Sequence, residues 1–168
     1  TLFPYTTLFR SLFVSSRIEI TKYSISDRTS FSPYVCEDYS FSKNCEATAD
    51  HIYVNPLVII PINDNPFTET ERKLPIEFPY KQTILLNVHM TIPEGYVIEE
   101  KCNGARIETP NKEISCHIKC LVDDKTSFVQ YRLDINDTFF GVTDYNMVKD
   151  VYAKICEYSK NMLVLKKM

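Results

Sequence analysis

Apolar and polar residues alternate with a period of two along much of this chain, and this pattern predicts half-buried antiparallel strands. The alternation is clearest over residues 83–92, 113–122 and 127–135, which we expect to form a three-stranded meander. A weaker alternation of apolar and polar residues predicts further strands at residues 17–25, 39–41, 51–60, 96–99 and 162–165. Most of the ordered chain is therefore expected to be β-structure.

One segment near the C-terminus changes period. Between residues 144 and 160, apolar and aromatic side chains recur at steps of three and four, which is typical of an amphipathic helix. Thr143 is a suitable N-cap, and Asp144 suits the positive end of the helix dipole. The sequence thus predicts a mainly β fold, an antiparallel β-sandwich with one C-terminal α-helix.

A proline-rich stretch between residues 55 and 76 follows neither pattern. Its prolines stand beside apolar runs, which makes the stretch too stiff for a flexible linker. We expect an ordered, extended connection that crosses between sheets. Within it, Asp64 and Asn65 are expected to form a turn, Phe67 to act as a buried anchor, and Arg72 to join an ion pair.

The composition of the chain and the lengths of its apolar runs bear on two kinds of partner, nucleic acid and membrane. The chain has 168 residues, 44% of them hydrophobic, and a net charge of −3, so the broad basic surface that nucleic acid requires is not expected. The longest apolar runs, such as residues 56–62, are far shorter than the roughly 20 residues of a bilayer span. We therefore expect neither a nucleic-acid partner nor a membrane span.

The first eleven residues, TLFPYTTLFRS, resemble the in-frame translation of a common short-read sequencing adapter. The match covers every one of these positions. We therefore expect residues 1–11 to be an assembly artefact, and residues 12–168 to form one domain. A genuine strand rich in tyrosine and phenylalanine is the alternative.

Six cysteines and three histidines raise the question of a metal site. In Cys116-His117-x-x-Cys120, the two cysteines share one face of a predicted strand but lie roughly 13 Å apart. A tetrahedral zinc ion needs sulfur ligands about 2.3 Å from one centre, and His117 would point to the opposite face. We therefore expect Cys116 and Cys120 to be small apolar core residues, and no metal or cofactor.

A cysteine nucleophile needs a thiol whose pKa is lowered by a nearby imidazole. Cys156 lies near the end of the predicted helix, where the dipole raises a thiol pKa. His51 follows Asp50, but neighbours on a strand face opposite ways. We therefore expect no catalytic residue in this chain. Cys36 and Cys45 either form a disulfide in an oxidising compartment or remain free thiols.

Several strings of residues carry a resemblance to a known family. They are Asp50-His-Ile-Tyr53, Asn55-Pro56, Asn65-Pro66-Phe67, Glu71-Arg72-Lys73, Pro75, Leu86-Asn-Val-x-Met90, Pro93-Glu-Gly-Tyr96 and the tail Val164-Leu-Lys-Lys167. Over residues 17–168 the chain resembles the C-terminal domain, of unknown function, of bacterial transglutaminase-like proteins. It departs from that pattern at Lys101-Cys102-Asn103-Gly104, where the family commonly has Leu-Pro, so this turn is expected to differ.

The resemblance implies a role for the whole domain rather than for single residues. In such proteins an N-terminal β-sandwich precedes the transglutaminase-like core, and a second sandwich ends the chain. The catalytic Cys, His and Asp belong to the core, and no motif here matches them. The resemblance thus implies a non-catalytic accessory domain that packs on an upstream core and helps to shape a cleft for a peptide or protein substrate. It also implies an exported, periplasmic or envelope-associated protein.

Two other functions remain open from the sequence. A stand-alone binding or adhesion module would use Tyr34, Tyr39 and Phe41 as a platform for a carbohydrate. A small thiol hydrolase would use Cys116 or Cys36 together with His51.

Overall fold

The computed structural model describes residues 19–26, 36–59 and 62–168. The chain divides into two compact units, with the boundary after Cys45. In the first unit, β1 (Glu19–Ser26) and β2 (Cys36–Ser42) pair as antiparallel strands. Within the described residues this confirms both strands predicted there, and β2 begins earlier than predicted. The predictions for residues 1–11 and for Tyr34 lie outside the described residues.

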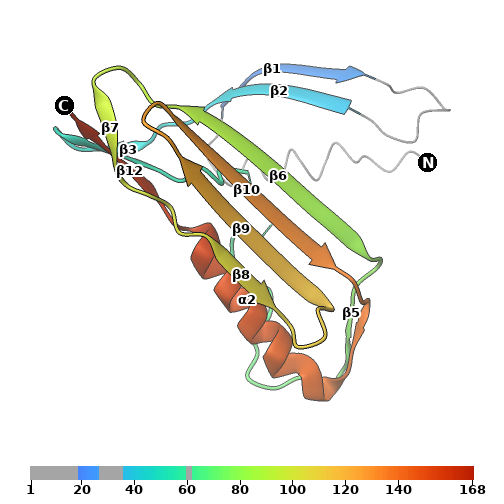
Figure 1. Ribbon diagram of the computed structural model, residues 1–168. Helices are drawn as coiled ribbons and strands as arrows, with labels where there is room; N and C mark the ends of the chain where they lie inside the picture. The colour runs from blue at the N-terminus through green and yellow to red at the C-terminus, as the bar shows by residue number, and fades with distance from the viewer. Residues whose placement is uncertain (1–18, 27–35, 60–61) are drawn as a thin grey trace. The chain divides into compact units, whose positions relative to one another are not determined.

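The second unit is built on a long antiparallel sheet with the strand order β6-β10-β9-β8 (Figure 1). Its strands are β6 (Gln82–Thr91), β8 (Ala105–Glu108), β9 (Ile114–Val122) and β10 (Thr126–Ile135). The three long strands confirm the alternation, but the predicted meander is wrong. β6 pairs with β10 instead of β9, because the unpredicted strand β8 takes the other side of β9.

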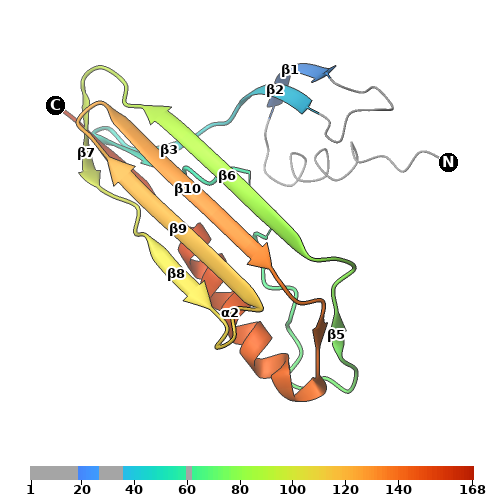
Figure 2. The same cartoon turned by 45° about the vertical axis from the view of Figure 1, so that its right-hand side comes forward.

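Two further sheets complete this unit. One has the order β3-β4-β12-β7, formed by β3 (Glu46–Ala47), β4 (His51–Val54), β12 (Leu163–Lys167) and β7 (Tyr96–Glu100). The other pairs β5 (Ile76–Glu77) with β11 (Phe139–Phe140). Figures 1 and 2 show β7 near one end of the long sheet and β5 near the other. The predicted mainly β fold with antiparallel sheets and a C-terminal helix is confirmed.

Helix α2 (Tyr145–Ser159) follows a short 3-10 helix, η1 (Val142–Asp144). The predicted N-cap Thr143 is wrong, because the 3-10 turn moves the start of the α-helix and puts Asp144 at the N-cap. The Asp144 carboxylate accepts a hydrogen bond from the Gly141 backbone N–H at 2.9 Å. No helix among the described residues combines the length and hydropathy that a bilayer crossing requires.

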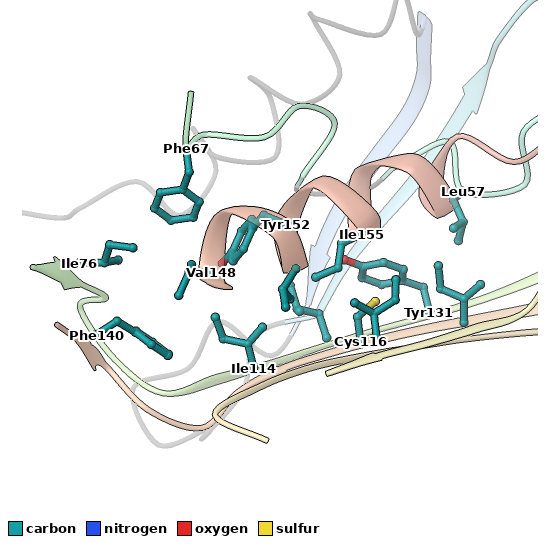
Figure 3. Close-up of a cluster of buried hydrophobic side chains, with 14 of the residues drawn as sticks. Leu57, Phe67, Ile76, Ile114, Cys116, Tyr131, Phe140, Val148, Tyr152 and Ile155 are labelled. Carbon is teal, nitrogen blue, oxygen red and sulfur yellow. The ribbon is translucent and has the colours of Figure 1, made fainter. Parts of the chain in front are cut away.

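The main core lies between α2 and one face of the long sheet (Figure 3). Side chains from β9 and β10 meet side chains from the helix, and the most deeply buried include Ile114, Cys116, Tyr131, Leu133, Val148 and Ile155. At the far end of the sheet, Ile92, Leu163 and Leu165 form a smaller cluster beneath the second four-stranded sheet. The long sheet is therefore covered partly by a helix and partly by strands.

The strand predicted at residues 51–60 ends at Val54, because Asn55 redirects the chain. The Asn55 Oδ1 accepts a hydrogen bond from the Leu57 N–H at 2.8 Å, and its Nδ2 donates to the Ser159 carbonyl at 3.1 Å. Pro56 has no backbone N–H, so it cannot donate a further hydrogen bond to a neighbouring strand. Leu57 is then buried, with 4% of its surface exposed.

The string Asn65-Pro66-Phe67 repeats this arrangement. The Asn65 Oδ1 accepts from the Phe67 N–H at 3.0 Å, and its Nδ2 donates to the Lys149 carbonyl at 2.9 Å. Phe67 is buried and meets the Tyr152 ring edge to face at 4.9 Å, which confirms its predicted role as an anchor. Since Asn55 bonds near the end of α2 and Asn65 near its start, the connecting segment runs antiparallel to the helix.

The connection continues past these two asparagines as an ordered chain. The Glu69 carbonyl accepts hydrogen bonds from the Tyr145 hydroxyl and the Lys149 ammonium, both at 2.8 Å. Arg72 is exposed, and the ion pair expected of it is not formed with any described residue. Hydrogen bonds to α2 hold this segment, together with an exposed ion pair at 3.3 Å between Asp64 and Lys160, the residue that follows the helix.

We expect Asn65→Ala to lower the free energy of unfolding by about 1–3 kcal/mol, because it removes two hydrogen bonds worth about 0.5–1.5 kcal/mol each. Urea denaturation followed by circular dichroism measures this change. Asn63→Ala is the control, since Asn63 is exposed and makes no side-chain hydrogen bond within the described chain. It should change the same quantity by less than about 0.5 kcal/mol. Equal stability of the two variants would contradict the role of Asn65.

Candidate functional site

The two buried free cysteines, Cys116 and Cys156, are poor candidates for a nucleophile. Cys116 on β9 is fully buried beneath α2, and burial raises the pKa of its thiol to about 12. Cys156 on α2 is also buried, and burial raises its thiol pKa as well. Both thiols therefore stay protonated near neutral pH and are poor nucleophiles. The prediction that Cys116 is a small core residue is confirmed.

The same prediction for Cys120 is wrong, because Cys120 forms a disulfide with Cys102. Cys102 lies on the segment that leads into β8, and the pairing of β8 with β9 brings this segment beside Cys120. The sequence gives no direct signal for this bond. The hairpin register set by the turn at residues 109–112, if extended beyond β8, places Asn103 rather than Cys102 opposite Cys120.

Cys36 and Cys45 are both exposed and free. Of the two alternatives that the sequence left open for this pair, the structure therefore has the free thiols. Cys36 lies on β2, and Cys45 follows that strand.

His51 belongs to a small charge cluster on the sheet of β4, β12 and β7. Its Nε2 lies 2.9 Å from Glu99 Oε2, and the Lys166 ammonium lies 2.9 Å from Glu99 Oε1. The hydrogen bond from Lys166, together with the charges of Lys166 and His51, holds the pKa of Glu99 below its usual range. No thiol or hydroxyl of the described residues is hydrogen-bonded to the His51 ring, so the cluster pairs charges across strands and contains no nucleophile.

The face of the long sheet that points away from α2 is mainly polar, although Leu85 and Leu121 are exposed on it. Arg132 contacts Asp134 at 2.8 Å, and Arg106 contacts Glu108 at 2.9 Å. The hydrogen bond from Arg132 lowers the pKa of Asp134, and the bond from Arg106 lowers that of Glu108. His117 lies on this outer face, as predicted, while Cys116 points into the core. These charges neutralise one another in pairs along the strands.

A hollow lies between β8 and α2. Figure 1 shows the helix running along this edge strand. The hollow, which we call the β8–α2 groove, has a volume of about 590 Å³ and is lined by residues 104–108 and by Val151, Lys154, Glu157 and Tyr158. Ile107 and Val151 are almost fully buried at its base, and charged side chains stand at its rim.

The proposed carbohydrate platform lies largely outside the described residues. Of its three aromatic residues, only the side chain of Phe41 is described, and 38% of its surface is exposed. A role for this hairpin in sugar binding stays a prediction.

We expect iodoacetamide at neutral pH to modify Cys36 and Cys45 quickly, because both are exposed. Cys116 and Cys156 should be modified only after unfolding in urea, since burial keeps them protonated and covered. Cys102 and Cys120 should need a reductant as well. Peptide mass mapping of the three samples measures this order. Rapid labelling of Cys116 in the folded chain would restore the thiol hydrolase as a candidate.

Comparisons with known proteins place the fold. No curated protein matches the chain in sequence. A crystal structure of a protein from Parabacteroides distasonis, described as a candidate protease, is similar with a TM-score of 0.56 and 14% identity. The similarity covers 71% of this chain and 24% of that protein. At this identity the similarity establishes the fold alone, and the chain spans about a quarter of the protein that it matches.

The sequence also matches a family model, described as a domain of unknown function with solved structure (DUF3858). The match runs from residue 50 to residue 165, which is more than half of the chain. It includes both Asn-Pro strings, the disulfide and the β8–α2 groove. The chain therefore belongs to the DUF3858 family.

Proposed function

We propose that this chain is a non-catalytic accessory domain of a larger protein, whose transglutaminase-like core carries the catalytic Cys, His and Asp. The observation that carries the proposal is the size relation to the similar structure. This fold corresponds to 24% of a much longer protein described as a candidate protease. A domain of this kind would pack on the core and contribute to a cleft for a peptide or protein substrate.

The chemistry of the described residues supports an accessory role. Cys116, the cysteine most central to the fold, is buried with a raised thiol pKa. His51 is engaged by Glu99 instead of a nucleophile. The strings that carry the family resemblance, Asn55-Pro56 and Asn65-Pro66-Phe67, serve to fasten the chain to α2. The contacts of these strings are structural, which supports an accessory role.

A stand-alone binding module is the second candidate, and the β8–α2 groove favours it. A domain with its own binding groove would not require a catalytic partner. The two candidates differ in what the complete gene encodes, so the gene discriminates between them.

We expect the complete gene to encode, upstream of codon 12, a transglutaminase-like core with a catalytic Cys, His and Asp. Genomic sequencing tests this directly. Deletion of residues 46–168 from the full-length protein should then raise KM for a peptide substrate more than it lowers kcat, because the core keeps its catalytic residues. A complete gene without such a core would contradict the accessory role and leave the binding module.

We also propose that the protein works in the cell envelope or the periplasm. The Cys102–Cys120 disulfide supports this, because disulfides persist in oxidising compartments and are rare in the cytosol.

Replacement of Cys102 and Cys120 together by alanine should lower the free energy of unfolding by about 3 kcal/mol, the contribution expected for a loop of this length. Urea denaturation of protein purified from the periplasm measures it. The matched control is Cys36→Ala with Cys45→Ala, which removes two exposed free thiols and should leave stability unchanged. If periplasmic protein carried reduced Cys102 and Cys120, the proposed location would lose its support.

A further inference from the structure

β8 is an edge strand whose outer side is unpaired. It is the last strand in the order β6-β10-β9-β8, and among the strands that the structure describes only β9 pairs with it. The Thr109 N–H donates a hydrogen bond to the Ile114 carbonyl oxygen at 2.9 Å, so these two opposite residues form a hydrogen-bonded pair. This pair determines which residues of β8 bond to β9 and which do not. Hydrogen-bonded pairs alternate along antiparallel strands, so the main-chain groups of Arg106 and Glu108 point away from β9.

These outward main-chain groups have no partner in the described structure. No hydrogen bond from any described residue reaches the backbone N–H or C=O of Arg106 or Glu108. Unpaired N–H and C=O groups at a strand edge are a template for a further strand. The edge of β8 therefore offers two donors and two acceptors in the spacing that an extended chain requires.

The groove beside this edge has the form of a site for one strand. Its apolar base contains Ile107, 7% exposed, and Val151, 8% exposed. On the far side of the groove, α2 supplies Lys154 and Tyr158. Side chains of an added strand alternate in direction, so alternate residues would face the apolar base and the solvent.

The β8 edge is also held firmly in place. The disulfide ties Cys102, just before β8, to Cys120 on β9. A Cβ on Gly104 would lie only 3.0 Å from the Ile118 carbonyl oxygen, so glycine allows the chain to approach β9 closely at this point. A rigid edge loses little conformational entropy when a partner binds, which favours recognition.

We propose that the β8–α2 groove binds an extended peptide, which adds to the long sheet as a strand beside β8 and places one apolar side chain over Ile107 and Val151. The inference rests on the proposed function in that it names an extended peptide as what the accessory domain holds. Lys154 and Glu157 at the rim carry opposite charges, so the peptide is selected by its extended backbone and apolar side chain rather than by net charge.

An uncharged pentapeptide of alternating threonine and valine, acetylated at its N-terminus and amidated at its C-terminus, tests this with the full chain. Titration into the ¹⁵N-labelled protein should shift the amide signals of Arg106, Glu108 and Lys154 in a saturable way. Arg106→Pro removes an N–H that faces the groove and leaves the bonds to β9 in place, so it should weaken binding about tenfold. Arg106→Ala removes the same side chain, keeps the N–H, and should bind like the original chain.

A second comparison does not depend on the folding of a variant. The same pentapeptide with an N-methyl group on its central residue should bind the original protein at least about tenfold more weakly than the unmodified peptide. Absence of saturable shifts at millimolar peptide would overturn the proposal. So would equal binding of Arg106→Pro and Arg106→Ala, or equal binding of the two peptides.

These outcomes are independent of the complete gene. Peptide binding in the groove, with no catalytic core encoded upstream, would leave the groove as the site of a stand-alone module. A core encoded upstream, with no peptide binding, would overturn the groove proposal and leave the accessory role intact.

Discussion

The second unit depends on how the connecting segment is fastened along α2. The helix packs on one face of the long sheet, and Leu57 and Phe67 from the connecting segment join the same core beside the helix. Two asparagines achieve this with the same geometry. Each uses its carbonyl oxygen to turn its own chain and its amide nitrogen to bond a helix carbonyl, at Ser159 for Asn55 and at Lys149 for Asn65. Each proline that follows stiffens the turn, and the next residue, Leu57 or Phe67, enters the core.

Periodicity predicted the elements whose stability comes from one long buried face. β6, β9, β10 and α2 are each long enough for the pattern of apolar residues to repeat several times. β8 has four residues and only Ala105 and Ile107 turned inward, so its pattern does not rise above chance. β5 and β11 have two residues each, and they exist because the chain around them is already held in place. Their pairing is a result of the tertiary fold, which local sequence does not contain.

The chemical predictions that needed only local strand geometry succeeded, and those that depended on contacts between distant segments failed. The argument that placed Cys116 inside and His117 outside used strand geometry alone, and the structure agrees. Cys120 shares the inward face with Cys116, yet its environment is decided by Cys102, which arrives through the unpredicted strand β8. The β8–α2 groove was equally out of reach, because its two walls come from segments far apart in the sequence. One missed strand of four residues thus concealed both the disulfide and the groove.

An unpaired strand edge usually threatens a protein with aggregation, and natural sheets protect such edges with short strands, charged residues or a covering element. β8 is short and carries Arg106 and Glu108, so it has two of these protections. The third is partial, because α2 runs beside the edge without filling the space between them. The peptide proposed above is a single extended chain that would lie in this space, between strand and helix. The arrangement that guards against aggregation is therefore the one that leaves room for a peptide.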